Sequence, residues 1–176
     1  MKIGHSGKAA ILFGLGAMTI YLVMVLGTLK HLTDLAMVLP FDLRPTGYSP
    51  ADAAVLLNAL GETGRQFYLT RQIALDTLYP ALLALTLIST LRWRAARFGP
   101  TLMTRIGGPL AILAAAFDYL ENLGIGLMLL VGPDPTLVQA ASAASMLKSA
   151  LTTAAMLAVV AALASILRGR MSRQRA

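Results

Sequence analysis

The stretch PLAILAAAFDYLENLGIGLMLLV, residues 109–131, decides the fold, because it is long enough to cross a bilayer yet carries polar groups near its middle. These groups are Asp118, Glu121 and Asn122, and their spacing of three and four places them on one helix face. An ionisable group at mid-bilayer costs on the order of 3 kcal/mol, so these side chains should point inward. The expected partner is Lys148, the only lysine inside a later apolar segment.

The composition places the whole chain in the membrane. Of its 176 residues 57% are hydrophobic and only 13% are charged, whereas soluble domains carry about 25% charged residues. The length suits four helices of roughly 20 residues each and leaves no room for a soluble domain. We therefore predict an all-α integral membrane protein, a four-transmembrane-helix bundle forming one domain over residues 1–176. The predicted spans are about 9–29, 67–92, 107–131 and 137–167.

The distribution of positive charge predicts the orientation. Ten of the 15 basic residues fall in three segments that hold no acid, at the two ends and between the second and third spans. They are Lys2, Lys8, Arg92, Arg94, Arg97, Arg105, Arg168, Arg170, Arg173 and Arg175. Cytoplasmic loops are enriched in Lys and Arg, so both termini should lie in the cytoplasm of a bacterial-type inner (plasma) membrane. The basic tail is expected to attract anionic lipid, and no nucleic-acid partner is predicted.

The connection over residues 30–66 should lie outside the cytoplasm. Ser49 precedes Pro50, and Asp52 follows three residues after the serine, which is the pattern of a capped helix start. Gly61 is a typical residue at a helix end. We predict a short amphipathic helix over about 50–60 that lies in the interface or covers the end of the bundle.

A polar stripe runs along the second predicted span, at spacings of four, four and three residues. It comprises Tyr68, Gln72, Asp76 and Tyr79, with Arg65 extending it outward. Pro80 removes the amide that would bond the carbonyl of Asp76, which predicts a kink and a free acceptor. The alternative is that Asp76 stays hydrated near the headgroups. The candidate substrate-binding residues are Arg65, Tyr68, Arg71, Gln72, Asp76, Tyr79 and Asn122.

The charges of the spans do not balance. Lys148 cannot neutralise Asp76, Asp118 and Glu121 together, although Arg71 could offset Asp76 from the outer boundary. The remainder requires a proton on one acid, or a bound cation. We therefore take Glu121, Asp118 and Lys148 as candidate catalytic residues, in which the lysine could steady an anion. The alternative is a structural ion pair with one permanently neutral acid.

Several kinds of site are excluded or disfavoured. The chain has no cysteine, so thiolate chemistry and Cys-ligated metals are ruled out. His5 and His31 lie at opposite ends of the first span, which argues against a bis-histidine haem. The chain has no phosphate-binding or hydrolase motif. We expect no cofactor and no metal.

Three functions remain open. The first is a buried site that handles a lipid or small molecule, with acid–base chemistry as one option. The second is a proton- or cation-coupled transporter that acts as an oligomer, because four helices are few for a carrier. The third is a non-catalytic accessory subunit of a membrane complex. The expected partners are membrane lipids, further copies of the chain or another membrane protein.

Overall fold

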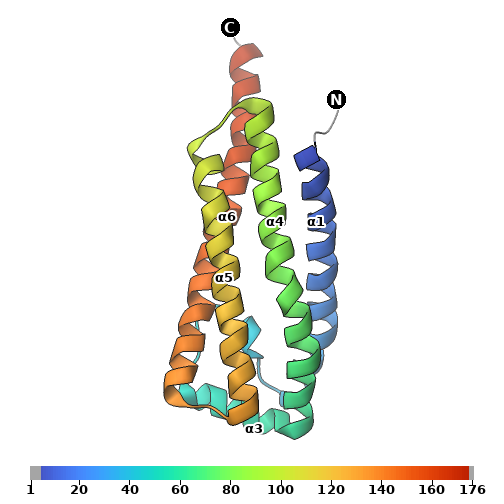
Figure 1. The fold of residues 1–176 in the computed structure, drawn as a ribbon, viewed down its shortest axis with the longest axis vertical. Coiled ribbons are helices and arrows are strands. Elements are labelled where there is room, and N and C mark those ends of the chain that lie inside the picture. The colour runs from blue at the N-terminus through green and yellow to red at the C-terminus, as the bar shows by residue number, and fades with distance from the viewer. Residues whose placement is uncertain (1–4, 175–176) are drawn as a thin grey trace.

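The structure, a computed structural model, describes residues 5–174 of the chain, with side-chain surroundings over 6–166. The described part is helical and contains four segments long and apolar enough to cross a membrane. These segments are Ser6–Ala36, Pro50–Phe98, Leu102–Val131 and Pro135–Ile166. They lie side by side as an elongated bundle with both termini at one end (Figure 1).

The first segment is longer than the predicted span 9–29. It joins α1 (His5–Val23), the π-helical η1 (Met24–Thr28) and α2 (Leu29–Ala36), and it ends where Met37 adopts a left-handed φ of 56°. The helix continues because Leu29, Leu32 and Ala36 are buried against the bundle. The exposed Lys30 and Asp34 also pair at i,i+4, 2.5 Å apart, which adds a small stabilisation. Charge alone is therefore a poor marker of where this helix stops.

The second segment bends sharply. It contains α3 (Pro50–Phe67), the π-helical η3 (Tyr68–Gln72) and α4 (Ile73–Phe98). The Ser49 side chain accepts from the amide of Asp52 and the Asp52 carboxylate accepts from the amide of Ser49, a reciprocal cap. Gly61, at φ 58°, breaks the helix, so α3 lies across the end of the bundle before the chain turns into α4 (Figure 1).

The face that α3 turns toward the bundle is apolar. Leu56, Leu57 and Leu60 are buried in a cluster with Ile125 and Met128 of the third segment. The α3 helix therefore closes this end of the bundle by ordinary core packing. Whether it also lies in a membrane interface stays a prediction.

The loop between α2 and α3 is anchored inside the bundle. It carries the short η2 (Phe41–Leu43), in which Phe41 is fully buried. The amide of Tyr48 donates to Ser142 Oγ at 2.8 Å. Gly47 has φ +85°, and a Cβ there would lie 2.6 Å from Ser142 Oγ, so only glycine fits this approach. The loop is thus held against α6.

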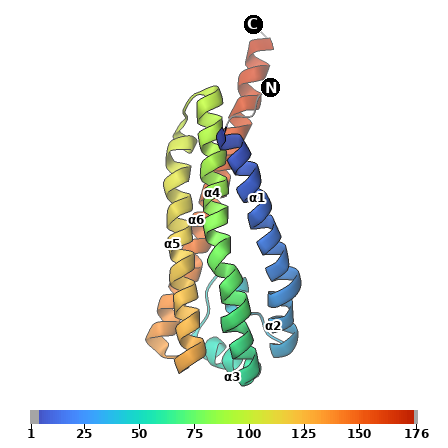
Figure 2. The same ribbon diagram turned by 45° about the vertical axis from the view of Figure 1, so that its right-hand side comes forward.

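The third and fourth segments, α5 (Leu102–Val131) and α6 (Pro135–Gln174), pack most extensively. A Cβ on Gly124 would lie 2.7 Å from Cβ of Ala141, which shows how closely the two helices approach. The α1 helix packs chiefly on α4, and α4 in turn packs on α5 (Figure 2).

Several helix boundaries differ from the prediction, most of them at the end of the bundle that holds the termini. The connection predicted over 92–105 spans only residues 99–101, because α4 continues to Phe98. A reciprocal cap between Thr101 and Thr104 starts α5 five residues before the predicted 107, so Pro109 lies inside the helix. The helix of the fourth span, α6, likewise begins at Pro135 and continues to Gln174, beyond the predicted 137–167, while the segment apolar enough to cross a membrane is Pro135–Ile166.

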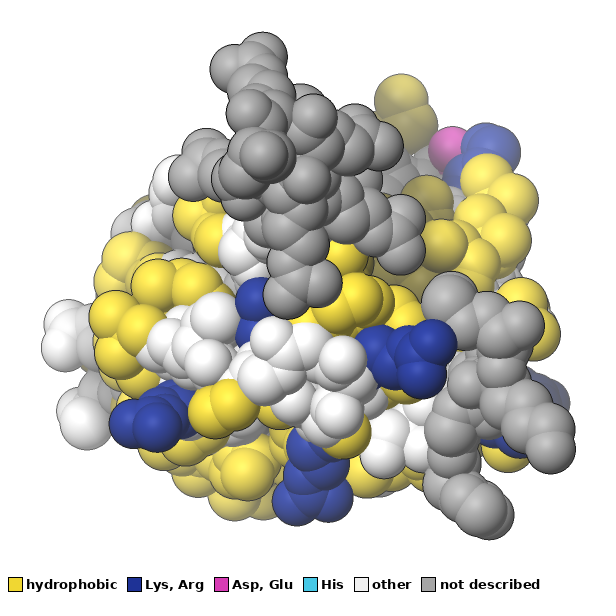
Figure 3. Space-filling model, turned by 90° about the horizontal axis from the view of Figure 1, so that it is seen from above, with side chains coloured by type: hydrophobic (Ala, Val, Ile, Leu, Met, Phe, Trp, Pro, Cys, Tyr) yellow, Lys and Arg dark blue, Asp and Glu magenta, His cyan; other side chains and the backbone are white. Residues whose placement is uncertain are grey.

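Among the arginines at this end whose surroundings the structure describes, Arg94 is the buried one. Arg94 is 5% exposed, and its guanidinium donates to the carbonyl of Ala162 at 3.0 Å, to Ser165 Oγ at 2.6 Å and to the carbonyl of Gly99. Arg92 and Arg97 are exposed instead. Figure 3, which looks onto this end, shows Lys and Arg side chains spread around the rim among hydrophobic ones.

Candidate functional site

Lys148 of α6 lies between two acids of α5. Its Nζ is 3.1 Å from Asp118 Oδ1 and also forms an ion pair with Glu121 Oε2. Both acids are buried, and Lys148 is largely buried with them. The predicted pairing of this lysine with the acids of residues 109–131 is therefore present, while the catalytic roles of the three residues stay predictions.

Helix packing explains how this pairing forms. The contact between Gly124 and Ala141 brings α5 and α6 together one turn away from Glu121. The hydroxyl of Ser145, one turn before Lys148, donates a hydrogen bond to Glu121 Oε1. Glu121 is thus held by α6 at both oxygens, which fixes the rotation of the two helices relative to each other.

A second acidic centre contains Asp42, a residue that was not predicted from the sequence. Asp42, in η2, accepts hydrogen bonds from the Tyr68 hydroxyl and, at 3.2 Å, from Gln72 Nε2. Asp42 stands between two apolar residues in a loop bounded by Pro40 and Pro45. An acid flanked by apolar residues was the only indication in the sequence that Asp42 is buried, and it could not show that the loop folds back into the bundle.

Two π-helical turns meet at this centre. Thr28 of η1 donates to Gln72 Oε1 of η3 at 2.5 Å, and Gln72 Nε2 lies 3.5 Å from Met24 Sδ. A π-turn inserts an extra residue into a helix and is frequent at functional sites. Here the two turns let Gln72 reach both the first segment and Asp42.

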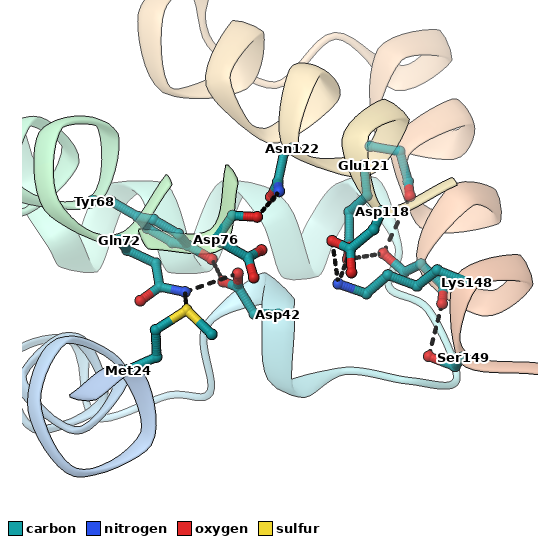
Figure 4. Close-up of polar contacts among 12 residues, drawn as sticks. Met24, Asp42, Tyr68, Gln72, Asp76, Asp118, Glu121, Asn122, Lys148 and Ser149 are labelled. Atoms are coloured by element: carbon teal, nitrogen blue, oxygen red, sulfur yellow. Dashed lines mark hydrogen bonds and ion pairs between the residues drawn. The ribbon is translucent and has the colours of Figure 1, made fainter. Parts of the chain in front are cut away.

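Asp76 has its backbone satisfied and its side chain unsatisfied. Asn122 Nδ2 donates to the Asp76 carbonyl at 3.1 Å, which is the acceptor that Pro80 frees four residues later. Asp76 is 4% exposed, and its Oδ2 has no hydrogen-bond partner among the described residues. Figure 4 shows its carboxylate pointing toward that of Asp42.

A cavity of about 290 Å³ joins the two acidic centres. Its lining includes polar side chains and the apolar side chains of Met24, Val25 and Leu83; the polar ones are Asp42, Gln72, Asp76, Asp118 and Lys148. Tyr21 of α1, which is 44% exposed, and exposed Thr153 of α6 also line it. The cavity therefore reaches the surface of the bundle between α1 and α6.

The other predicted binding residues divide into two groups. Tyr79 lines the cavity and packs on Tyr21, with ring centroids 5.8 Å apart. Arg65 instead donates to the carbonyl of Leu57 at 2.9 Å and lines a different depression, while Arg71 is exposed. Neither arginine lines the cavity, so the expectation that Arg71 offsets Asp76 is not met.

Tyr48 lies beside the same cluster. Its hydroxyl is buried without a hydrogen-bond partner among the described residues. Burial, followed by the nearby Glu121 carboxylate, raises the pKa of Tyr48 above its ordinary value. The phenol is therefore neutral at physiological pH and adds no charge to the site.

The cluster is more acidic than the sequence indicated. Asp42 joins Asp76, Asp118 and Glu121, so four carboxylates accompany one lysine. The described residues hold no group of three or more His, Cys, Asp or Glu side chains arranged to bind a metal ion. No known protein family, curated protein or solved structure matches the chain, so the site has to be interpreted from its own geometry.

Proposed function

We propose that this protein binds a lipid or small amphiphilic molecule in the cavity between α1, α4 and α6. The observation that carries the proposal is that the cavity is lined by both polar and apolar side chains and reaches the surface between two helices long and apolar enough to cross a membrane. A ligand in the bilayer could enter sideways, place its polar group at the acids and leave its chain against Met24, Val25 and Leu83. Ligand pockets commonly combine apolar walls with a few placed polar groups.

The proposed orientation follows from the charges. The end with Arg92, Arg97 and Arg105 would face the cytoplasm with both termini, and α3 would cover the opposite end of the bundle. In this orientation α3 is the extracytoplasmic amphipathic helix predicted from the sequence. The membrane would be a bacterial-type inner membrane.

Acid–base chemistry on the bound molecule is part of the proposal. Asp118 lines the cavity while it contacts Lys148, and Asp76 lines it with a free oxygen. Two carboxylates in different surroundings are the usual arrangement for general acid–base catalysis, in which one group donates a proton and another accepts it. Arg65 and Arg71, which lie outside the cavity, have no part in this proposal.

Lipid extraction and mass spectrometry of the purified protein test the binding. We expect a retained amphiphile, and we expect Val25→Trp to displace it by filling the cavity. The matched control is Leu26→Trp, because its neighbour Leu26 is 69% exposed and does not line the cavity. Equal retention by both variants would show that bound lipid lies elsewhere and would refute the proposal.

A proton- or cation-coupled carrier is the second candidate, favoured by the adjacent carboxylates of Asp42 and Asp76. It predicts uptake into proteoliposomes that depends on a pH gradient or a membrane potential. Uptake that ignores both would remove this candidate and leave the amphiphile site untouched.

A further inference from the structure

We propose that the polar group received by this cavity is a primary ammonium, held between Asp42 and Asp76, so that the ligand is an amine-bearing amphiphile. This inference rests on the proposed function and narrows it to one class of ligand. It also reverses the expectation that Lys148 steadies an anion.

Lys148 is already neutralised. Its ammonium contacts both Asp118 and Glu121, so an arriving anion would meet two carboxylates around the only cation of the cluster. Bringing a like charge to buried carboxylates is unfavourable at short range. An anionic headgroup is therefore the least suitable occupant of this wall.

Asp42 and Asp76 lack such a partner. Asp42 is held by Tyr68 and Gln72, which are both neutral donors, and no salt bridge reaches either carboxylate within residues 6–166. Asp76 Oδ2 is buried and has no donor within the part of the chain that the structure describes, and Asp76 lines the cavity. Buried charges are normally paired, so this position calls for a cation or a shared proton.

A primary ammonium fits this need. It carries one positive charge and three donors, so it can bond Asp76 and Asp42 together. A quaternary ammonium has the charge but no donor, and a hydroxyl has a donor but no charge. Comparing these three head groups therefore separates the contribution of charge from that of hydrogen bonding.

The size of the cavity limits how much of the ligand can lie inside it. At about 290 Å³ it lies at the small end of ligand pockets, which commonly measure roughly 300–1,000 Å³. It holds a head group and the first methylenes, after which an apolar chain would leave past Tyr21 and Leu43, the exposed apolar residues of its lining.

The experiment titrates four twelve-carbon probes into the full chain in phosphatidylcholine nanodiscs. The probes are dodecylamine, dodecyltrimethylammonium, dodecanol and dodecanoate, and the readout is the ligand-induced shift of the thermal unfolding midpoint, from which a dissociation constant is fitted. Val25→Trp provides the background from partitioning into lipid. We expect dodecylamine to bind at least tenfold more tightly than each of the others.

Two isosteric variants assign the binding to the proposed residues. Asp76→Asn should weaken dodecylamine at least tenfold and leave dodecanol unchanged, and Asp42→Asn should do the same if Asp76→Asn does not fold. The control is Glu62→Gln, an exposed acid outside the cavity, which should bind all four probes as the unchanged chain does. An unchanged preference for the amine in both aspartate variants would overturn the inference.

The outcomes separate this inference from the proposed function. Binding of dodecanoate or dodecanol as tightly as dodecylamine overturns the ammonium and keeps an amphiphile cavity. Equal shifts in the unchanged chain and in Val25→Trp for every probe overturn both. If dodecylamine binds, enrichment of phosphatidylethanolamine over phosphatidylcholine from mixed-lipid membranes identifies a phospholipid amine, and its absence identifies an amine without a phosphate.

Discussion

Arg94, near the end of the bundle that holds the termini, and Lys148, near the middle of its helix, are two enclosed cations that are held in different ways. Arg94 is surrounded by neutral acceptors, the carbonyls of Gly99 and Ala162 and the hydroxyl of Ser165. Lys148 is surrounded by charged ones, Asp118 and Glu121. Both connect α6 to a neighbouring segment, so both contribute to packing.

The two cations differ in which groups would be left unpaired if the side chain were removed. Removing Arg94 leaves neutral groups without a donor, whereas removing Lys148 leaves two buried carboxylates without a cation. The second arrangement couples packing to charge, and it borders the cavity described above. We therefore interpret Arg94 as a structural clamp that stabilises the packing of α4 on α6. The Lys148 cluster both stabilises the packing of α5 on α6 and borders the proposed ligand site.

The largest expected effect comes from Lys148→Met, which keeps the length of the side chain and removes the charge. Breaking a buried ion pair on one side costs about 3–5 kcal/mol, because the remaining charge is uncompensated. The free energy of unfolding, measured by titrating a denaturing detergent into mixed micelles, should fall by about that amount.

The control for this prediction restores neutrality. Lys148→Met combined with Asp118→Asn and Glu121→Gln leaves no unpaired charge at the cluster, so it should recover most of the lost stability. A triple variant that is no more stable than Lys148→Met would mean that geometry matters here more than charge.

A smaller effect is expected from Arg94→Gln. This variant removes a charged fork that makes three hydrogen bonds, and hydrogen bonds to charged groups are worth about 1.5–3 kcal/mol each when both partners are buried. Because the acceptors left behind are neutral and near a solvated end, we expect a total loss of about 2 kcal/mol in the same unfolding assay.

Two further variants serve as controls for the Arg94 prediction. Arg97→Gln, at an exposed position of the same helix, should change the free energy of unfolding by less than about 0.5 kcal/mol. Arg94→Lys keeps the charge but lacks the planar fork, so it should fall between the two. If Arg97→Gln proves as costly as Arg94→Gln, the clamp interpretation is wrong.

The sequence predicted the parts of this structure that follow from local pattern. Hydropathy gave the four long helices, and the spacing of Asp118 and Glu121 gave a shared face opposite Lys148. The cap at Ser49 and the break at Gly61 were also readable, because both depend on residues next to each other in the chain. Helix ends were less accurate, since Lys30 and Arg94 were interpreted as boundary residues and lie inside helices.

Asp42 and the cavity could not be predicted, because both depend on tertiary folding of a loop. Nothing local to Pro40–Pro45 shows that Phe41 is fully buried and carries its neighbour into the bundle. Three buried acids around Lys148 were therefore predicted from the sequence, and Asp42 was not among them. Arg65 was placed on the stripe by its spacing, but the π-turn at Tyr68–Gln72 lies between it and Asp76 and changes the register of that face.

The smallest expected effect tests whether the Lys148 cluster depends on helix contact as well as on charge. A Cβ at Gly124 would lie 2.7 Å from Ala141 Cβ, so Gly124→Ala must push α5 and α6 apart near Glu121, at a cost of about 1 kcal/mol after the better helix propensity of alanine is included. Gly126→Ala is the matched control, because its Cβ would make ordinary contacts at 3.7 Å with Ile73, and it should be neutral or stabilising. In the Gly124→Ala background, Lys148→Met should cost less than in the unchanged chain, because the ion pair is already weakened. Additive effects of the two substitutions would instead show that the lysine reaches its acids independently of this contact.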